Sequence, residues 1–514
     1  MAGPGIPRAG HRLYRHHPDP LQTTLPPVKA EMTTTEETLS SAPAGGLPRE
    51  SVRVLAVLLV GAFVVILNET ALNVALSRIM ADLGIDERTA QWLTTGFMLT
   101  MAVVIPVTGW LMERLPTRTV FGLAMSLFSL GTLIAAVGWG FPGLLAGRLV
   151  QASGTAIMMP LLMTTVMELV PSDQRGRVMG TISLVISAAP AIGPTMSGVI
   201  LQFLPWRFVF ALVLPIALTI LFVGLRQVPN LNETVKVKLD ALSVPLAALG
   251  FGGLVYGLSQ VGSPNTTGME IALGAGVVGL GLFVWRQLVL QRTDAALLDL
   301  RTFSHPIFST AIAVMAIAMA VLFGTIIALP LILQQVLHAE PLFVGLLTLP
   351  GALLMGLLAP GVGRLYDRIG PRWLMVPGSL FVLAAFGLFA RVSTTTPWWQ
   401  LLTAHVLLSI GLACLFTPLF TISLGSLPPH LYGHGSAMVG TVQQVAGAAG
   451  TALFVTVMSS VAALQPPGTP LEEALAAGAR ASFLSVGALW LVGIVAIPFL
   501  RKPADAPHAP VGGH

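Results

Sequence analysis

The chain has 514 residues, of which 54% are apolar and only 10% are charged, and its formal net charge is +5. Soluble domains hold roughly 25% charged residues, so this composition excludes an ordinary soluble protein and favours one polytopic α-helical membrane protein. The basic residues are scattered singly among connections, which argues against a nucleic-acid partner. The single cysteine, Cys414, excludes an intrachain disulfide and a cysteine-based metal cluster.

The first 53 residues are rich in Pro, His and Thr and contain no apolar stretch, which predicts a disordered tail without a secretory signal peptide. Fourteen apolar segments follow, and most are long enough to cross about 30 Å of hydrocarbon. They cover roughly residues 54–76, 90–111, 119–138, 142–168, 178–201, 207–225, 241–260, 270–290, 306–333, 342–362, 373–391, 397–423, 437–463 and 481–500.

Two charged connections repeat, Gly109–Arg118 after the second segment and Gly363–Arg372 after the tenth, with a glycine, an acid and two arginines in the same register. A repeat of this kind in two hydrophobic parts predicts an internally duplicated membrane protein. The predicted division is an N-terminal tail (1–53), a first six-helix bundle (54–225), a linker with two inserted helices (226–305), a second six-helix bundle (306–500) and a C-terminal tail (501–514).

Lys and Arg concentrate in alternate connections, and this bias holds when the N-terminal tail is left out. The positive-inside rule therefore places the N-terminus, the C-terminus and both charged connections in the cytoplasm.

The acids of the charged connections can pair with arginine or face a helix N-terminus. Such contacts exist only when the inner ends of helices are close, so they would stabilise one of two global states. The alternative is a plain topogenic charge cluster. The residues assigned to these inner gate loops are Gly109, Glu113, Arg114, Arg118, Gly363, Asp367, Arg368, Gly370 and Arg372.

Two ionisable residues lie inside apolar segments. Arg148 would cost at least about 2.5–3.5 kcal/mol against lipid, so it must face protein or water, either in the mechanism or in a buried structural ion pair. Glu69 is the one acid well inside the first segment, where it is a candidate proton carrier or counter-charge for a cation; the alternative is a wet carboxylate near the outer end. We assign proton coupling to Glu69 and Arg148.

Weaker candidates for a polar substrate cavity are Asn68, Asn73, Gln151, His405, Gln443 and Gln444. Each is otherwise an interhelical hydrogen-bonding group or, for His405, a satisfied core residue. In the fifth segment, two prolines invite kinks and small residues permit close helix approach, which is either a rocking surface or ordinary packing. These residues are Pro190, Gly193, Pro194, Ser197 and Gly198.

The sequence contains no P-loop, no H-E-x-x-H and no G-x-S-x-G. We therefore expect neither an enzyme nor a metal or other cofactor. With no P-loop to hydrolyse ATP, the candidate proton carrier Glu69 suggests the proton motive force as the energy source.

These motifs together resemble the major facilitator superfamily, and within it the fourteen-span drug:proton antiporter branch, over about residues 54–500. Both charged connections look like its loop motif G-x-L-x-D-R-x-G-x-R, with Glu113 and Pro116 replacing Asp and Gly in the first copy. Arg148-Leu149-Val150-Gln151 looks like the start of its helix-4 motif, and Gly193–Gly198 like its helix-5 antiporter motif. Leu67–Leu76 is similar to the branch's helix-1 motif, and its Leu-Asn-Glu-Thr variant to the lincomycin-resistance-like subgroup.

The resemblance implies a major facilitator fold with two six-helix bundles plus two inserted helices, fourteen transmembrane helices in all. It implies alternating access in a bacterial plasma membrane, with export of amphipathic drugs or lipophilic compounds in exchange for protons and resulting antibiotic resistance. The expected partners are the lipid bilayer and a small amphipathic substrate, with the protein a monomer. The alternative is an exporter or flippase of one endogenous lipid-like metabolite, and a membrane sensor without flux is a third reading.

Overall fold

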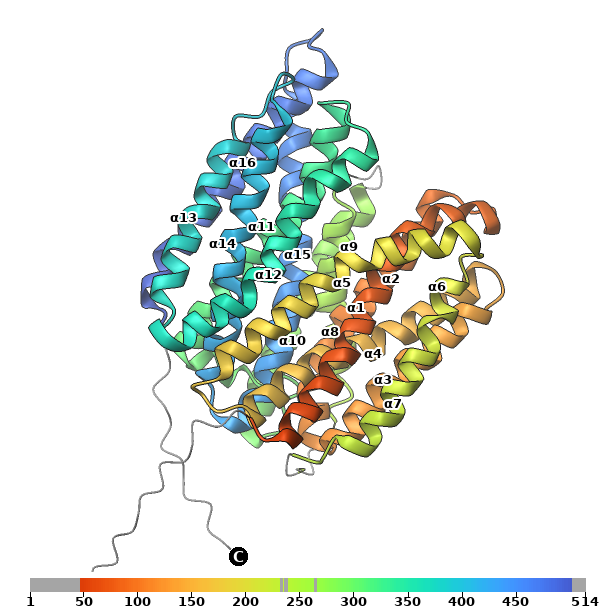
Figure 1. Ribbon diagram of the computed structural model, residues 1–514, viewed down its shortest axis with the longest axis vertical. Helices are drawn as coiled ribbons and strands as arrows, with labels where there is room; N and C mark the ends of the chain where they lie inside the picture. Colours follow the sequence, from red (N-terminus) through yellow and green to blue (C-terminus); the bar gives the residue numbers. More distant parts are fainter. Residues whose placement is uncertain (1–46, 232–233, 235–238, 263–265, 502–514) are drawn as a thin grey trace, which may run out of the picture. The chain divides into compact units, whose positions relative to one another are not determined.

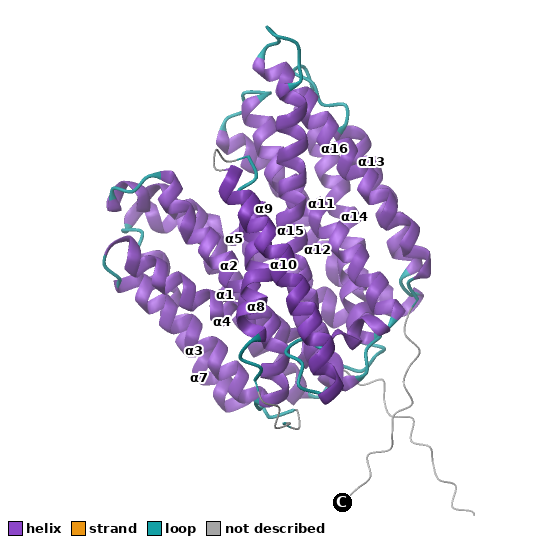
Figure 2. Ribbon diagram, turned by 180° about the vertical axis from the view of Figure 1, so that it is seen from behind, coloured by secondary structure: helices purple, strands orange, loops and turns teal. Residues whose placement is uncertain are grey.

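The computed structural model describes residues 47–231, 234, 239–262 and 266–501 (Figure 1). Nearly all of the predicted tails, 1–53 and 501–514, and part of the predicted linker lie outside these residues. The described residues form helices and connections without a strand (Figure 2), so the prediction of an all-α polytopic protein is confirmed.

Thirteen helices or helix pairs among the described residues are long and apolar enough to cross a membrane. Their bounds are α1 Arg49–Leu83, α2 Glu87–Arg114, α3 Thr117–Val137, α4 Gly140–Leu169, α5 Arg175–Phe203, α6 Phe208–Ala211 with α7 Val213–Gln227, α10 Thr266–Leu290, α11 Pro306–Gln335, α12 Pro341–Ile369, α13 Arg372–Phe389, α14 Trp398–Gly425, α15 Tyr432–Ala463 and α16 Leu471–Ala496.

The predicted segment 241–260 is shorter and irregular. It consists of α8 (Ser243–Ala247), a π-helical turn (Ala248–Gly252) and α9 (Gly253–Ser259). Backbone at Gly250 and Gly253 lies so close to α10 that an added Cβ would come within 2.7–2.9 Å of it. Small residues at such positions let two membrane helices pack backbone to backbone, so α8–α9 and α10 form a tight pair.

Several helices extend beyond the apolar segments that predict them. α1 begins after Pro48 and ends at Gly84, which adopts the left-handed conformation that terminates many helices. α16 begins ten residues before the predicted segment 481–500, with Glu472 and Glu473 in its first turn. Acids at that position interact favourably with the helix dipole, so the polar extension is stable as helix.

Two sets of helices pack mainly within themselves, α1–α7 (the first set) and α11–α16 (the second set). They meet where α5 contacts α12 and α14, and where α15 contacts α2 and α4. The span α8–α9 packs on α2 and α15, and α10 packs on α8–α9. The cross-contacts gather near the charged connections, for example between Gly176 and Gly363, between Gly180 and Ala359, and between Thr164 and Ser436. Away from this end the ribbons of the two sets diverge (Figures 1 and 2). The sets are therefore closed at the end that carries the charged connections.

Candidate transport site and gate

Arg148 lies in the interior of the first set. Its side chain on α4 is 1% exposed, and Nη1 donates a 2.6 Å hydrogen bond to Oε1 of Gln151. The amide of Gln151 in turn donates to Oγ1 of Thr132 on α3, at 2.7 Å. The guanidinium carbon is 4.1 Å from the ring centroid of Phe97 on α2, within cation–π range. Arg148 is thus held by three helices and does not face lipid.

Two glycines allow this arrangement. A Cβ on Gly147 would lie 2.6 Å from the backbone nitrogen of Ala135, and a Cβ on Gly131 would collide with the backbone of Gln151. The backbones of α3 and α4 therefore touch, which brings Thr132 within reach of the Gln151 amide.

Glu69 on α1 is half-buried and is the acid that interacts electrostatically with Arg148. The two charges do not form a direct ion pair. Beside it, Asn68 is fully buried, and neither its amide nitrogen nor its oxygen has a hydrogen-bond partner among the described residues. Asn73, one turn further along, is exposed. The first-segment motif therefore places one acid and one unsatisfied amide in the interior.

α5 lies against α1 at Gly193. Gly193 is buried, and a Cβ there would collide with Oγ1 of Thr70 and come within 3.0 Å of the Leu67 carbonyl oxygen. Thr70 Oγ1 is in turn 3.5 Å from the carbonyl oxygen of Ala189. Ser197 is fully buried and its hydroxyl has no partner among the described residues, whereas Pro190 is exposed and Pro194 half-buried. The small residue that this contact requires is therefore Gly193.

Replacing Gly193 with alanine should destabilise the protein by about 1–3 kcal/mol, because the added methyl group overpacks the α1–α5 contact. The matched control is Gly198→Ala on the same helix, where an added Cβ meets no atom within 4 Å, so the expected close approach at Gly198 is absent in this state. Thermal unfolding in detergent should show a lowered midpoint for Gly193→Ala alone. Equal midpoints for both variants would contradict the α1–α5 contact.

The remaining cavity candidates lie in the second set. His405 Nε2 is 3.1 Å from the Thr348 carbonyl oxygen on α12, so His405 serves packing between α12 and α14. The Gln443 amide donates to Sδ of Met315 at 3.8 Å, and the Gln444 amide to Sδ of Met101 at 3.7 Å. Met101 belongs to α2, so Gln444 reaches across to the first set.

The second charged connection holds the start of α5. The Asp367 carboxylate accepts hydrogen bonds from the backbone N–H groups of Gly176 at 2.9 Å and Arg177 at 2.7 Å. An acid at this position caps the orphan donors and complements the positive end of the helix dipole. Gly363 touches Gly176 so closely that no side chain fits between them. Gly370 ends α12 with a positive φ of 79°.

The first charged connection holds the start of α15 through a different group. Oε1 of Glu113 is 2.8 Å from Nε2 of His434, a side chain only 3% exposed. The expected carboxylate–guanidinium pair is therefore not formed by Glu113, because the His434 ring reaches it from the facing helix. Gly109 lets that ring in, since a Cβ there would lie 2.6 Å from Nδ1. Arg118 instead donates from Nε to the Val228 carbonyl oxygen at 2.7 Å.

The arginines Arg114, Arg368 and Arg372 are exposed at the ends of their helices. Sequence reasoning missed His434, although Tyr432-Gly433-His434 opens α15 as Arg175-Gly176-Arg177 opens α5. The likeness between these two helix starts is the sequence signal that could have identified His434.

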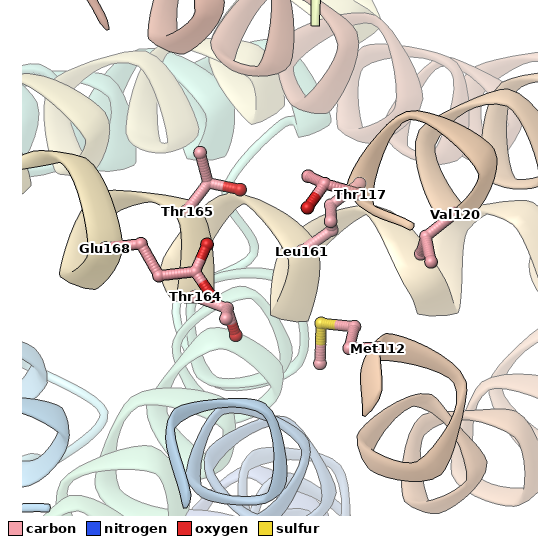
Figure 3. A pocket seen from close by; sticks show the side chains of 7 residues that line it. All are labelled: Met112, Thr117, Val120, Leu161, Thr164, Thr165 and Glu168. Carbon is pink, nitrogen blue, oxygen red and sulfur yellow. The ribbon is translucent and has the colours of Figure 1, made fainter. Parts of the chain in front are cut away.

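A small pocket opens at the same end between α2, α3 and α4, with Glu168 pointing into it (Figure 3). It has about 20 Å³ of room for a water-sized sphere, enough for roughly one water molecule and far below a drug-sized site. Its lining residues are Met112, Thr117, Val120, Leu161, Thr164, Thr165 and Glu168.

The family model of the Major Facilitator Superfamily matches residues 58–451. The chain belongs to this superfamily. The family prediction is confirmed, and the chain is a multi-pass membrane transporter rather than an enzyme.

Among its relatives, the lincomycin resistance protein LmrB of Listeria monocytogenes is 37% identical over 466 residues, 89% of this chain and 98% of that protein. The uncharacterized MFS-type transporter YcnB of Bacillus subtilis is 39% identical over 452 residues, 88% of this chain and 95% of that one. The solved structure of the proton:xylose symporter XylE aligns with a TM-score of 0.62 at 15% identity, covering 88% of this chain and 96% of that one, and supports the fold alone.

Proposed function

We propose that this transporter exports amphipathic drugs or lipophilic compounds across a bacterial plasma membrane in exchange for protons, with both termini in the cytoplasm and no cofactor. The observation that carries this proposal is the pair of opposite charges in the first set. Arg148 is almost completely buried there, and its nearest compensating acid is Glu69, on another helix and not in direct contact. A carboxylate whose charge is only partly compensated in a membrane interior is suited to bind and release a proton.

One such carboxylate, which carries one proton per transport cycle, supplies enough free energy to drive export. Proton entry releases roughly 2.3 kcal/mol per charge per 100 mV, or about 3.5 kcal/mol at about 150 mV. This free energy corresponds to about a 300-fold gradient of a neutral substrate. The coupling is reciprocal, so protonation weakens substrate binding as much as substrate weakens proton binding.

The described state supplies the geometry for alternating access. The first and second helix sets move as two six-helix bundles, and the charged connections form the inner gate, closed here. Two contacts hold that end closed: the hydrogen bonds from the start of α5 to Asp367, and the contact between Glu113 and His434. Breaking both contacts opens the cavity to the cytoplasm, and the described structure is then the outward-facing state.

The substrate class is supported by relatives that are named for lincomycin resistance. In everted vesicles, an imposed pH gradient should drive uptake of lincomycin and of several lipophilic cationic dyes, and an uncoupler should abolish it. Uptake of one lipid-like compound without the dyes or lincomycin would favour the alternative of a dedicated metabolite exporter or flippase. No gradient-dependent uptake of any compound would contradict proton-coupled export.

A further inference from the structure

A buried glutamine ties the inserted helices to the segment that follows them. Gln287 on α10 is fully buried, and its amide nitrogen donates to Oγ of Ser243 on α8 at 2.8 Å. Its carbonyl oxygen accepts from the backbone N–H groups of Leu297 at 2.8 Å and Leu298 at 3.2 Å. One side chain thus fixes both inserted helices to the connection before α11.

A charged contact next to Gln287 reinforces this attachment. Arg286 donates from Nε and Nη2 to the two carboxylate oxygens of Asp240, at 3.1 and 2.8 Å. The hydrogen bond from Arg286 lowers the pKa of Asp240 to about 2. Asp240 therefore stays ionised throughout the physiological pH range, so pH changes in that range do not weaken this contact.

The residue after Leu298 reaches the inner gate. The backbone N–H of Asp299 donates to Nδ1 of His434, at 3.3 Å. Because Nδ1 accepts this hydrogen bond, the ring proton of the neutral imidazole lies on Nε2, where it is donated to Glu113. The Asp299 carboxylate itself is occupied by Arg301, through the backbone N–H and Nε, both at 2.8 Å. The backbone of Asp299 therefore sets the orientation and tautomer of the histidine that Glu113 uses.

We propose that the inserted helix pair acts as a brace that holds His434 in the ring orientation required by Glu113, and so keeps the inner gate closed. Gln287 is the positioning residue of this brace. The inference rests on the alternating access proposed above and gives a role to the two helices beyond the two six-helix bundles. It also gives a role to the packing of α8–α9 on α2 and α15, the two helices that Glu113 and His434 join.

A cross-linking assay tests the brace in the absence of substrate and of a proton gradient. Oγ1 of Thr164 and Oγ of Ser436 are 2.9 Å apart across the closed end, so cysteines at these two positions report closure in a Cys414→Ala background. Gln287→Leu leaves the backbone N–H groups of Leu297 and Leu298 without their acceptor and detaches Ser243, and should lower the initial cross-linking rate by roughly tenfold. The matched control Gln260→Leu, at the opposite end of the inserted pair, should cross-link at the wild-type rate.

The second measurement separates positioning from general destabilisation. If the brace acts through Glu113, then Gln287→Leu should add nothing to Glu113→Gln in a double-mutant cycle. Should Gln287→Leu fail to fold, Ser243→Ala removes one contact of the same amide, together with the hydroxyl's hydrogen bond to Asp240, and should slow cross-linking in the same direction. Additive effects, or equal rates for Gln287→Leu and Gln260→Leu, would overturn the proposal. Brace-dependent cross-linking in a protein without flux would refute the proposed export and leave the brace intact.

Discussion

Replacing Arg148 with alanine should reduce proton-coupled transport by about a hundredfold or more. The substitution removes a guanidinium that is 1% exposed, and leaves Glu69 without its counter-charge and the Gln151 side-chain oxygen without its donor. Breaking a buried charge interaction by deleting one partner costs about 3–5 kcal/mol, and each 1.4 kcal/mol is tenfold in an equilibrium constant. Substrate-dependent proton movement in proteoliposomes, followed with a pH-sensitive dye, measures the loss.

Two further variants define what Arg148 supplies. Arg148→Lys keeps the charge but loses the planar group that lies over Phe97 and bonds Gln151, so it should recover only a small part of the activity. Ser153→Ala changes a half-buried residue whose hydroxyl bonds the Leu149 carbonyl oxygen of its own helix, and should transport at the wild-type rate. Wild-type proton exchange in Arg148→Ala would remove Arg148 from the coupling mechanism.

Replacing Glu69 with glutamine should abolish uptake driven by a pH gradient while leaving substrate exchange without a gradient in place. Glutamine has nearly the same shape as a protonated glutamic acid and cannot release a proton, so it fixes the protonated form. The protein should still bind substrate and open to each side, since the gate contacts at Asp367 and Glu113 are unchanged. Gradient-driven uptake and counterflow of labelled substrate, measured in the same vesicles, separate the two activities.

Glu50→Gln is the matched control for Glu69→Gln. Glu50 is an exposed acid in the first turn of the same helix, so its substitution should leave both activities unchanged. Loss of counterflow together with driven uptake in Glu69→Gln would show that Glu69 serves folding or substrate binding rather than coupling.

The sequence predicts the helices and the two interior charges well for one physical reason. A long apolar run must be helical in a membrane, and an ionisable residue within such a run must have a protein or water partner. Arg148 and Glu69 stand out on this ground alone. The sequence also predicts the position of the irregular span Ser243–Ser259. It does not predict the π-helical turn within that span, because the turn depends on packing against α10.

The contacts between the first and second helix sets could not be predicted from the sequence, because they join residues that are far apart in the chain. Asp367 binds backbone N–H groups at Gly176 and Arg177, which no residue-type pattern records. His434 meets Glu113 only after α15 has packed on α2. Sequence patterns therefore identified the acid of each contact and, for Asp367, the kind of partner, a helix N-terminus, but not the helix that supplies it.

The close contact of Thr70 and Gly193 couples the position of α5 to that of α1. Gly193 lies 17 residues from Gly176, and this separation corresponds to about 25 Å of helix at 1.5 Å per residue. A tilt of about 10° at Gly193 would displace the start of α5 by about 4 Å, more than the hydrogen bonds to Asp367 can stretch. A small change of packing around Glu69 would thus be large enough, at the start of α5, to release the contact with Asp367.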